Sequence, residues 1–246
     1  MPDLVSRNDL EANIEDALLV EFGRFEKQIT AWMIARESLG DLSKLPKAFY
    51  DELYNRILAI LKIVLKEAYL DAHRSFSSDV QEMYQASVVM QRADAYVSRY
   101  APVLARQLIE TTEIDFERIA VNAPSLPSTS GNLVSALEAS GTLGSNRSSL
   151  IARTEVTQAI ASAESQILED LRNKGTNIEA TWYTQLDERV CVICEPRHSR
   201  QQGTNWEIPP PAHPNCRCEV EYVIIKEDGT RIEVSALEVR QLGGRA

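Results

Sequence analysis

The chain has 246 residues, and its 26 Lys and Arg side chains stand against 36 Asp and Glu side chains, which gives a formal net charge of −10 at pH 7. A chain of this length can bury a sizeable core and is predicted to form two lobes. The acidic balance argues against a protein whose main task is to grip DNA along an extended basic face, and no stretch approaches the roughly 20 apolar residues of a membrane span.

From the N-terminus to about residue 120 the apolar residues show helical periodicity. They recur at steps of three and four in two runs, which are Leu18, Leu19, Phe22, Phe25, Ile29, Trp32 and Met33, and then Phe49, Leu53, Ile57, Leu61, Val64 and Ala68. Each run predicts an amphipathic helix with one buried face. A more polar helix is expected over about residues 79–99, and Pro102 is predicted to mark a boundary before a further helix through Leu104 and Phe116.

The composition changes at residues 123–131, where prolines, serines and a glycine indicate a linker between the lobes. A short helix is expected around Leu133–Ala139, followed by a longer one. Ser148 or Ser149 can cap the first turn of the longer helix, and Gly175 offers a left-handed C-terminal exit. The apolar stripe of this helix comprises Ile151, Val156, Ile160, Ala163, Ile167 and Leu171.

After the longer helix the apolar period changes from 3.6 to two, which predicts strands. The alternating apolar positions are Ile178, Ala180, Trp182 and Thr184, and later Val220, Tyr222 and Ile224. Asp228-Gly229 is a hairpin signal that leads to Ile232 and Val234. Trp182 is expected to anchor the core of the sheet. The predicted fold class is therefore α+β, with a mostly helical N-terminal lobe followed by a small antiparallel-sheet lobe.

All four cysteines lie between positions 191 and 218, and His213 lies three positions before the third of them. The candidate metal ligands are Cys191, Cys194, His213, Cys216 and Cys218. Two thiols separated by two residues can turn back on one ion, and a second cluster about twenty residues later can close a tetrahedral site. The prolines of residues 208–212 predict an extended arm that returns the second cluster to the first. We predict one structural Zn²⁺ per chain; five candidates compete for four places, and the spare is one of His213, Cys216 and Cys218.

Other interpretations of this region are weaker. Four cysteines would also permit two disulfides, but no secretory signal opens the chain, and we expect it to fold in a reducing cytosol. No His-Glu-x-x-His helix is present to make a hydrolase, and Asp187 and Glu188 are interpreted as capping or solvated groups. His73 is placed on a helical surface, and His198 is a weak substitute ligand. Five arginines near the cysteines are interpreted as solvated, with DNA contact as the alternative: Arg189, Arg197, Arg200, Arg217 and Arg231.

Three segments resemble a known family. They are Ile151-Ala152-Arg153-Thr154-Glu155-Val156, then Trp182-Tyr183-Thr184 with Asp187, Cys191 and Cys194, and finally Pro210-Pro211-Ala212-His213-Pro214-Asn215-Cys216-Arg217-Cys218. Together they resemble the minor head protein family of tailed bacteriophages, also called the phage Mu F-like or head morphogenesis family. The resemblance covers roughly residues 100–225. It divides the chain into a helical lobe at 1–122 for portal or capsid docking, a linker at 123–131, and a phage Mu F-like lobe at 132–246.

The resemblance implies a non-enzymatic minor structural protein of the virion, involved in capsid assembly and morphogenesis and in DNA packaging or delivery. It places the protein inside the capsid near the portal vertex, and in the host cytoplasm during assembly. The implied partners are the portal protein and other capsid proteins, with packaged double-stranded DNA as a further contact, and neither a membrane nor a small-molecule substrate. The alternatives are a nucleic-acid-binding zinc module and an ADP-ribosyltransferase-like enzyme.

Arg153 and Glu155 belong to the segment that carries the resemblance. An Arg and Glu pair is compatible with an ADP-ribosyltransferase, but the sequence contains no recognisable nucleotide-binding motif. The simplest interpretation is an ion pair or cap contact at the start of a helix, which contributes little when exposed. The alternative is that Arg153 reaches the zinc lobe or a carbonyl in its turn.

Overall fold

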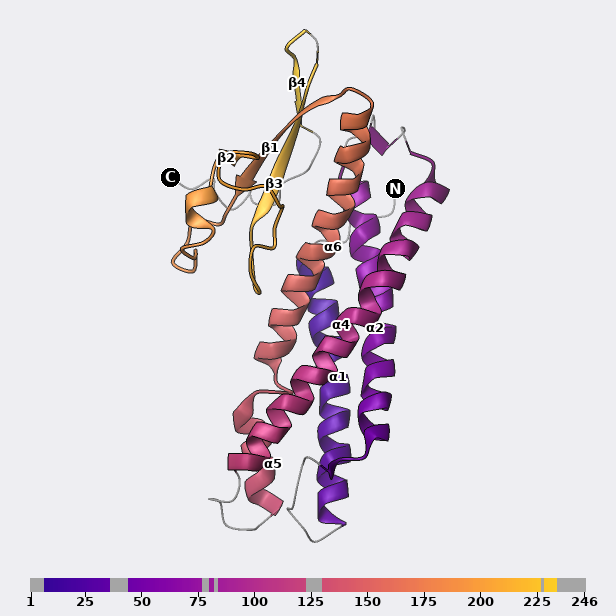
Figure 1. The fold of residues 1–246 in the computed structure, drawn as a ribbon, viewed down its shortest axis with the longest axis vertical. Coiled ribbons are helices and arrows are strands. Elements are labelled where there is room, and N and C mark those ends of the chain that lie inside the picture. Colours follow the sequence, from indigo (N-terminus) through magenta and orange to yellow (C-terminus); the bar gives the residue numbers. More distant parts are fainter. Residues whose placement is uncertain are drawn as a thin grey trace. The chain divides into compact units, whose positions relative to one another are not determined.

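The computed structural model describes residues 7–35, 44–76, 80–81, 84–122, 130–226 and 228–233. The elements in chain order are α1 (Arg7–Ile34), α2 (Lys47–Arg74), α4 (Ala86–Asn122), α5 (Ser130–Ser140), α6 (Ser145–Asn173), β1 (Asn177–Tyr183), η3 (Glu195–Arg197), β2 (Arg200–Gln201), β3 (Glu219–Ile225) and β4 (Arg231–Glu233) (Figure 1). Helices therefore precede a small antiparallel sheet, and the predicted α+β class is confirmed. None of the described helices combines the length and low charge that a bilayer span requires.

The chain forms two compact units that interleave along the sequence. The sheet unit takes in Arg7, Leu65–Asp94 and the described residues from Arg153 onward, and the helical unit takes in Asn8–Val64 and Ala95–Ala152. The domain boundaries expected from the sequence follow chain order instead, and they stay a prediction. Residues 123–129 of the expected linker lie outside the described residues, whereas the residues after them begin α5.

The helical unit is built on the apolar stripes that the periodicity predicts. In α1 the buried positions are Leu10, Ile14, Leu18, Phe22, Phe25 and Ile29. Phe25 lies against two rings from other helices, with centroid distances of 5.7 Å to Tyr50 and 6.0 Å to Phe116. These contacts join α1, α2 and α4 around one core, as amphipathic helices with matching stripes require.

Pro102 lies inside α4, which continues through it, so the predicted helix boundary is wrong. A proline within a helix removes one backbone hydrogen bond and crowds the carbonyl four residues earlier, at a cost of about 3 kcal/mol. Buried apolar residues nevertheless continue in helical step on both sides of it, with Val97 and Ala101 before it and Leu104 and Ala105 after it. Their combined burial outweighs the one lost bond.

The start of α6 also differs from the expectation. The helix begins at Ser145 rather than at Ser148 or Ser149. Ser148 is fully buried, and its backbone N–H donates to the Gly144 carbonyl at 3.2 Å, so it is already within the first helical turns. Several serines in this stretch can cap a helix, and Gly141, with φ of +66°, lies in the turn that precedes α6.

A half-buried arginine, Arg147, connects three parts of the helical unit. The Arg147 guanidinium donates to the Thr112 hydroxyl at 3.0 Å and to the carbonyls of Thr142 and Leu108 at 2.7 and 3.0 Å. Its Cζ atom lies 5.6 Å from the centre of the Phe22 ring. Burial lowers the pKa of Arg147, because desolvation disfavours its charge.

Arg147→Met is expected to lower the free energy of unfolding by about 2–4 kcal/mol, because three acceptors lose their donor within the protein. Urea denaturation followed by circular dichroism measures this change. The matched control is Arg118→Met, at an exposed position of α4, for which a change within about 0.5 kcal/mol is expected. Equal effects of the two substitutions would contradict the role given to Arg147.

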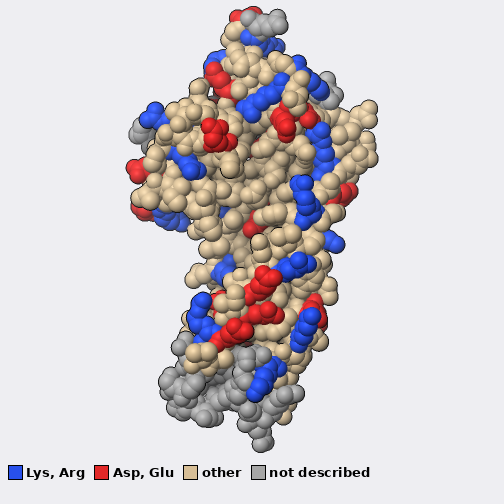
Figure 2. All heavy atoms as spheres, in the orientation of Figure 1, with Lys and Arg blue, Asp and Glu red and all other residues tan. Residues whose placement is uncertain are grey.

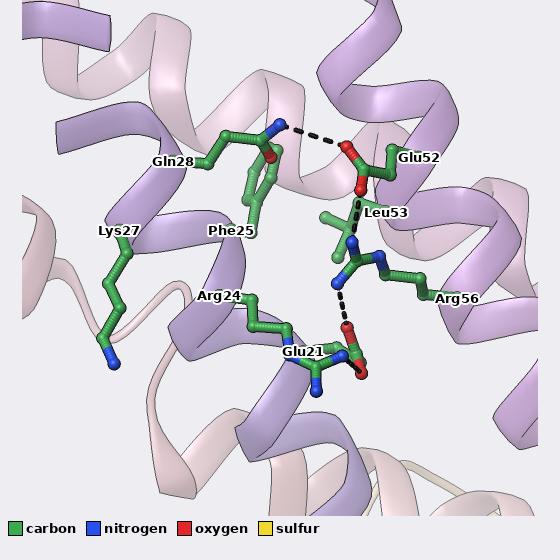
Figure 3. Close-up of a pocket in the computed structure, with 8 residues that line it drawn as sticks. All are labelled: Glu21, Arg24, Phe25, Lys27, Gln28, Glu52, Leu53 and Arg56. Atoms are coloured by element: carbon green, nitrogen blue, oxygen red, sulfur yellow. Dashed lines mark hydrogen bonds and ion pairs between the residues drawn. The ribbon is translucent and has the colours of Figure 1, made fainter. Parts of the chain in front are cut away.

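A pocket of about 290 Å³ lies between α1 and α2 and is lined mainly by charged side chains (Figure 3). Glu21 accepts from Arg24 at 2.8 Å and from Arg56 at 3.1 Å. Glu52 pairs with Arg56 and accepts from Gln28 at 3.1 Å. The two glutamates therefore bind side chains from both helices, and these contacts join α1 to α2.

The sheet unit contains four strands in the order β2-β1-β3-β4, with every neighbouring pair antiparallel. β1 and β3 pair along their full length, from Asn177 opposite Ile225 to Tyr183 opposite Glu219 (Figure 1). The predicted hairpin is confirmed: Gly229, with φ of +82°, donates to the Lys226 carbonyl at 2.9 Å between β3 and β4. Val234 lies outside the described residues.

The C-terminal end of α6 delivers the chain to the sheet. Gly175 has φ of +85°, its N–H donates to the Arg172 carbonyl at 2.9 Å, and the Thr176 N–H donates to the Leu171 carbonyl at 3.0 Å. This pair of bonds is the Schellman motif, and the predicted left-handed exit is confirmed. The core beyond it comprises Phe76, Val80, Ile167, Leu168, Leu171, Ala180, Trp182, Cys194, Trp206, Cys216, Cys218, Val220 and Tyr222. Three of the four cysteines thus belong to the apolar core of the sheet unit.

Candidate metal centre

The five candidate ligands lie on two turns and on the residues directly before β3. In the first turn, the Cys194 N–H donates to the Cys191 carbonyl at 3.0 Å. In the second, the Cys216 N–H donates to the His213 carbonyl at 3.2 Å. Both turns therefore place two donor side chains three positions apart on the same side of the chain.

The structure brings the five side chains into two groups of three that share Cys194, together called the Cys/His cluster. The His213 Nε2 atom lies 3.1 Å from Cys191 Sγ and 3.2 Å from Cys194 Sγ. Cys194 Sγ lies 3.8 Å from Cys216 Sγ, and the sulfur atoms of Cys194, Cys216 and Cys218 all lie within 4.8 Å of one another. The cluster is therefore able to hold a metal ion, with Cys194 common to both groups of three. Which of the five bind an ion stays a prediction.

The donor chemistry of the cluster fits zinc. Thiolate sulfur and imidazole nitrogen are the ligands of structural zinc sites, whereas Mg²⁺ and Ca²⁺ prefer oxygen. The His213 Nδ1 atom lies 2.7 Å from the Pro214 carbonyl, which accepts its proton and leaves Nε2 to face the sulfur atoms. A hydrogen bond from the Cys218 thiol is the main cause that lowers the pKa of Cys216 to about 5.

A second layer of polar contacts connects the two turns. Arg217 donates to both carboxylate oxygens of Asp187 at 2.6 and 2.7 Å, and to Gln185 at 2.8 Å. The Arg189 N–H also donates to Asp187 at 3.1 Å, so this carboxylate caps the turn before Cys191. The hydrogen bonds from Arg217 lower the pKa of Asp187 to about 2, and the bond from the Arg189 N–H makes a smaller contribution. Asp187 thus bonds to Arg189 before the first turn and to Arg217 beside the second, as its interpretation as a capping group expects.

Asp187→Ala is expected to make the protein release its metal to a chelator about 10-fold faster, because contacts around metal ligands typically contribute that much to retention. Zinc release to a coloured chelator can be followed directly. The control is Glu188→Ala, an exposed carboxylate on the adjacent residue, which should leave the rate unchanged. Equal release rates for both variants would show that the contact with Arg217 does not hold the turns.

The N-terminal part of α6 within the sheet unit holds the second turn. Arg153 donates to the Asn215 side chain, and the Asn215 N–H donates to the Thr154 hydroxyl at 2.8 Å. Asn215 has φ of +64°, a conformation that an asparagine tolerates better than most residues. Arg153 therefore contacts the second turn directly, which supports the alternative interpretation of this residue. Glu155 is buried.

Arg7 is a residue of this site that sequence reasoning missed. Its guanidinium forms an ion pair with Glu219 at 3.1 Å, donates to the Thr157 hydroxyl, and lies 3.5 Å from the Cys216 carbonyl. More than 200 positions separate Arg7 from Glu219 along the chain. No local pattern could have indicated the contact, because the residues that form it come together only when the sheet unit folds.

Glu164 on α6 lies near the ion pair of Arg7 and Glu219. Burial raises the pKa of Glu164 to about 8, and the negative charge of Glu219 adds to the shift, while Arg7 opposes it. In the unfolded chain a glutamate loses its proton near pH 4.5. Between these two pH values the folded state binds more protons than the unfolded state, so this group makes the free energy of unfolding fall as pH rises.

Glu164→Gln is therefore expected to gain stability relative to the wild type between pH 5 and pH 8, because an amide carries no proton to lose. Urea denaturation of both proteins at the two pH values measures the difference. Glu169→Gln, at an exposed position of the same helix, should differ from the wild type equally at both pH values. A stability difference for Glu164→Gln that does not change with pH would contradict the buried, protonated carboxyl.

The other histidines lie outside the cluster. His73 is half-buried, its ring packs edge-on against Tyr84 at 5.7 Å, and its Nε2 atom has no hydrogen-bond partner among the described residues. Its predicted place on a helical surface is thus corrected. His198 accepts the Thr184 N–H at 3.2 Å through Nδ1, and it belongs to neither group of potential ligands found in the described residues.

The arginines near the cluster mostly have partners. Arg231 pairs with Glu179 at 2.6 Å, Arg217 pairs with Asp187, and the Cζ atom of Arg197 lies 5.0 Å from the centre of the Trp182 ring. Basic and acidic side chains are also interspersed over the described residues of the face in Figure 2. The arginines thus stabilise the sheet unit, and an extended basic face for DNA is not favoured.

The fold and site define an α+β protein in which a long helix and a small antiparallel sheet frame a Cys/His cluster. Residues 128–221 match the family described as phage Mu protein F like protein. The match includes α6, β1, both turns and the start of β3. It confirms the resemblance and indicates a phage head-related protein. Neither a curated protein nor a solved structure matches the chain.

Proposed function

We propose that this chain is a minor structural protein of a tailed-phage head that acts in capsid assembly and morphogenesis and associates with the portal. The observation that supports this most is the family match at residues 128–221, which coincides with the segment that forms the Cys/His cluster. In the matched segment, three of the candidate metal ligands are packed into an apolar core, and Arg217 forms an ion pair with Asp187. Such a unit is suited to hold a shape within an assembly.

The proposed zinc ion stabilises the sheet unit. Cys194, Cys216 and Cys218 are buried together with Trp182 and Trp206 in one core. A four-stranded sheet with strands as short as two residues has a small core of its own. A structural zinc contributes on the order of 10 kcal/mol to folding, so it can offset that deficit. The role is structural because a set of four protein donors leaves no open position for a substrate.

The helical unit supplies the proposed docking surface for the portal protein or another capsid protein. Three exposed apolar side chains lie on the part of α4 that belongs to the helical unit: Val103, exposed by 49%, Ile114 by 55% and Val121 by 76%. Their spacings of eleven and seven residues place them on one face of the helix, because both spacings are close to whole numbers of helical turns. Exposed apolar stripes of this kind are candidates for partner contacts.

Co-purification with the portal oligomer from assembled heads tests the proposal. We expect the wild-type chain to remain with the portal, and Ile114→Glu to weaken this association. The matched control is Ile63→Glu, because Ile63 is also apolar and exposed, on α2 of the same unit. Absence of the wild-type chain from portal complexes would overturn the proposed association.

Contact with packaged double-stranded DNA is the weaker alternative. The net charge of −10 and the ion-paired arginines disfavour it. The affinity for a nonspecific DNA duplex, measured at two salt concentrations, tests this contact, because protein–phosphate contacts weaken steeply as the salt concentration rises. Absence of binding at low salt would reject this contact.

A further inference from the structure

We propose that the metal ion is held by Cys191, Cys194, His213 and Cys216, and that Cys218 is the spare residue. This assignment rests on the proposed structural zinc and specifies its ligands. It follows from the turns, the distances between donor atoms, and the position of Cys218 relative to β3.

The first argument is the equivalence of the two turns. Each has the form donor-x-x-donor, and each is closed by an N–H to carbonyl bond between its end residues, at 3.0 Å for Cys191 to Cys194 and 3.2 Å for His213 to Cys216. Two such turns facing each other supply four donors, which is the number that a structural zinc takes. Cys218 lies outside both turns.

The second argument is the spacing of the donor atoms. Two sulfur atoms on one tetrahedral zinc lie about 3.8 Å apart when each bond is about 2.3 Å long. The Sγ atoms of Cys194 and Cys216 lie 3.8 Å apart. The His213 Nε2 atom lies within 3.2 Å of the Sγ atoms of both Cys191 and Cys194, so the imidazole already faces the first turn.

Cys218 has a different position. It directly precedes β3, and with Val220 and Tyr222 it continues the alternating buried face of that strand. Its side chain is buried in the same apolar core as Trp182 and Val220. This position makes Cys218 a core residue of the sheet, and Arg217 between the two cysteines is directed to Asp187.

Substitution with cobalt(II) tests the assignment in the full-length chain. Cobalt replaces zinc at tetrahedral sites, and the absorption from thiolate-to-cobalt charge transfer reports how many sulfur ligands are bound. We expect one cobalt per chain and the same charge-transfer intensity in the wild type and in Cys218→Ala. Cys216→Ala should lose about one third of this intensity, as one of three thiolates is removed, and should bind cobalt on the order of 10-fold or more weakly.

Cys216→His keeps the assignment testable if Cys216→Ala does not fold. It restores four donors, so the chain should fold and bind one cobalt with about two thirds of the charge-transfer intensity. The reverse pattern, in which Cys218→Ala loses intensity and Cys216→Ala does not, would overturn the assignment and leave a metal site in place. A wild-type chain that binds no cobalt would overturn the proposed metal role itself.

Discussion

Cys194→Ser is expected to abolish metal retention and to unfold the sheet unit. Cys194 belongs to both groups of potential ligands and is also buried in the apolar core. Loss of a structural zinc removes on the order of 10 kcal/mol, which is comparable to the whole stability of an ordinary domain. Elemental analysis measures the zinc, and the fluorescence of Trp182 and Trp206, which pack on each other in this core, reports the unfolding.

The matched control for this substitution lies in the same turn. Val192 is 85% exposed and offers no metal donor, so Val192→Ser should retain one zinc and change the stability by about 0.5 kcal/mol or less. Retention of zinc and of native fluorescence by Cys194→Ser would contradict the expectation. A wild-type protein that is stably folded with four free thiols and no transition metal would end the zinc proposal.

Trp182→Ala is expected to lower the free energy of unfolding by about 3–5 kcal/mol. Trp182 is fully buried on β1, its ring centre lies 5.5 Å from that of Trp206, and Arg197 lies over its face. Removal of the indole leaves a cavity between the sheet and α6 that these neighbours cannot fill. Urea denaturation followed by far-ultraviolet circular dichroism measures the loss without relying on the missing fluorophore.

Trp182→Phe separates packing from hydrogen bonding at this position. The Nε1 atom of Trp182 has no hydrogen-bond partner among the described residues, so phenylalanine loses only ring area and no donor contact. Its destabilisation should therefore be less than half that of Trp182→Ala. Equal destabilisation by the two substitutions would mean that the indole N–H, and not the ring volume, is what the core requires.

The local elements were predictable because their signals lie close together in the sequence. Apolar residues at steps of three and four predicted the helices α1, α2 and α6, and apolar residues at every second position predicted the strands β1 and β3. Gly175 was predictable as a helix exit, since a left-handed residue at that place favours glycine. Pro102 was misjudged because its cost is local, whereas the burial that outweighs it comes from the rest of the helical core.

The sequence by itself determined the set of donors and their chemistry. Four cysteines and His213 within 28 residues, in two groups, indicate a zinc-type site before any fold is known. The sequence also contained the motif shared with the phage Mu F-like family, which indicates a phage head-related protein.

Only the tertiary structure decided how these donors are arranged and what surrounds them. It set Cys194 beside both His213 and Cys216, tied Arg217 to Asp187, and brought Arg7 to the second turn. The physical reason is that such contacts join residues far apart in the chain, and they form only when the helices and the sheet pack together. Spacing along the chain limits which atoms can meet, and packing decides which of them do.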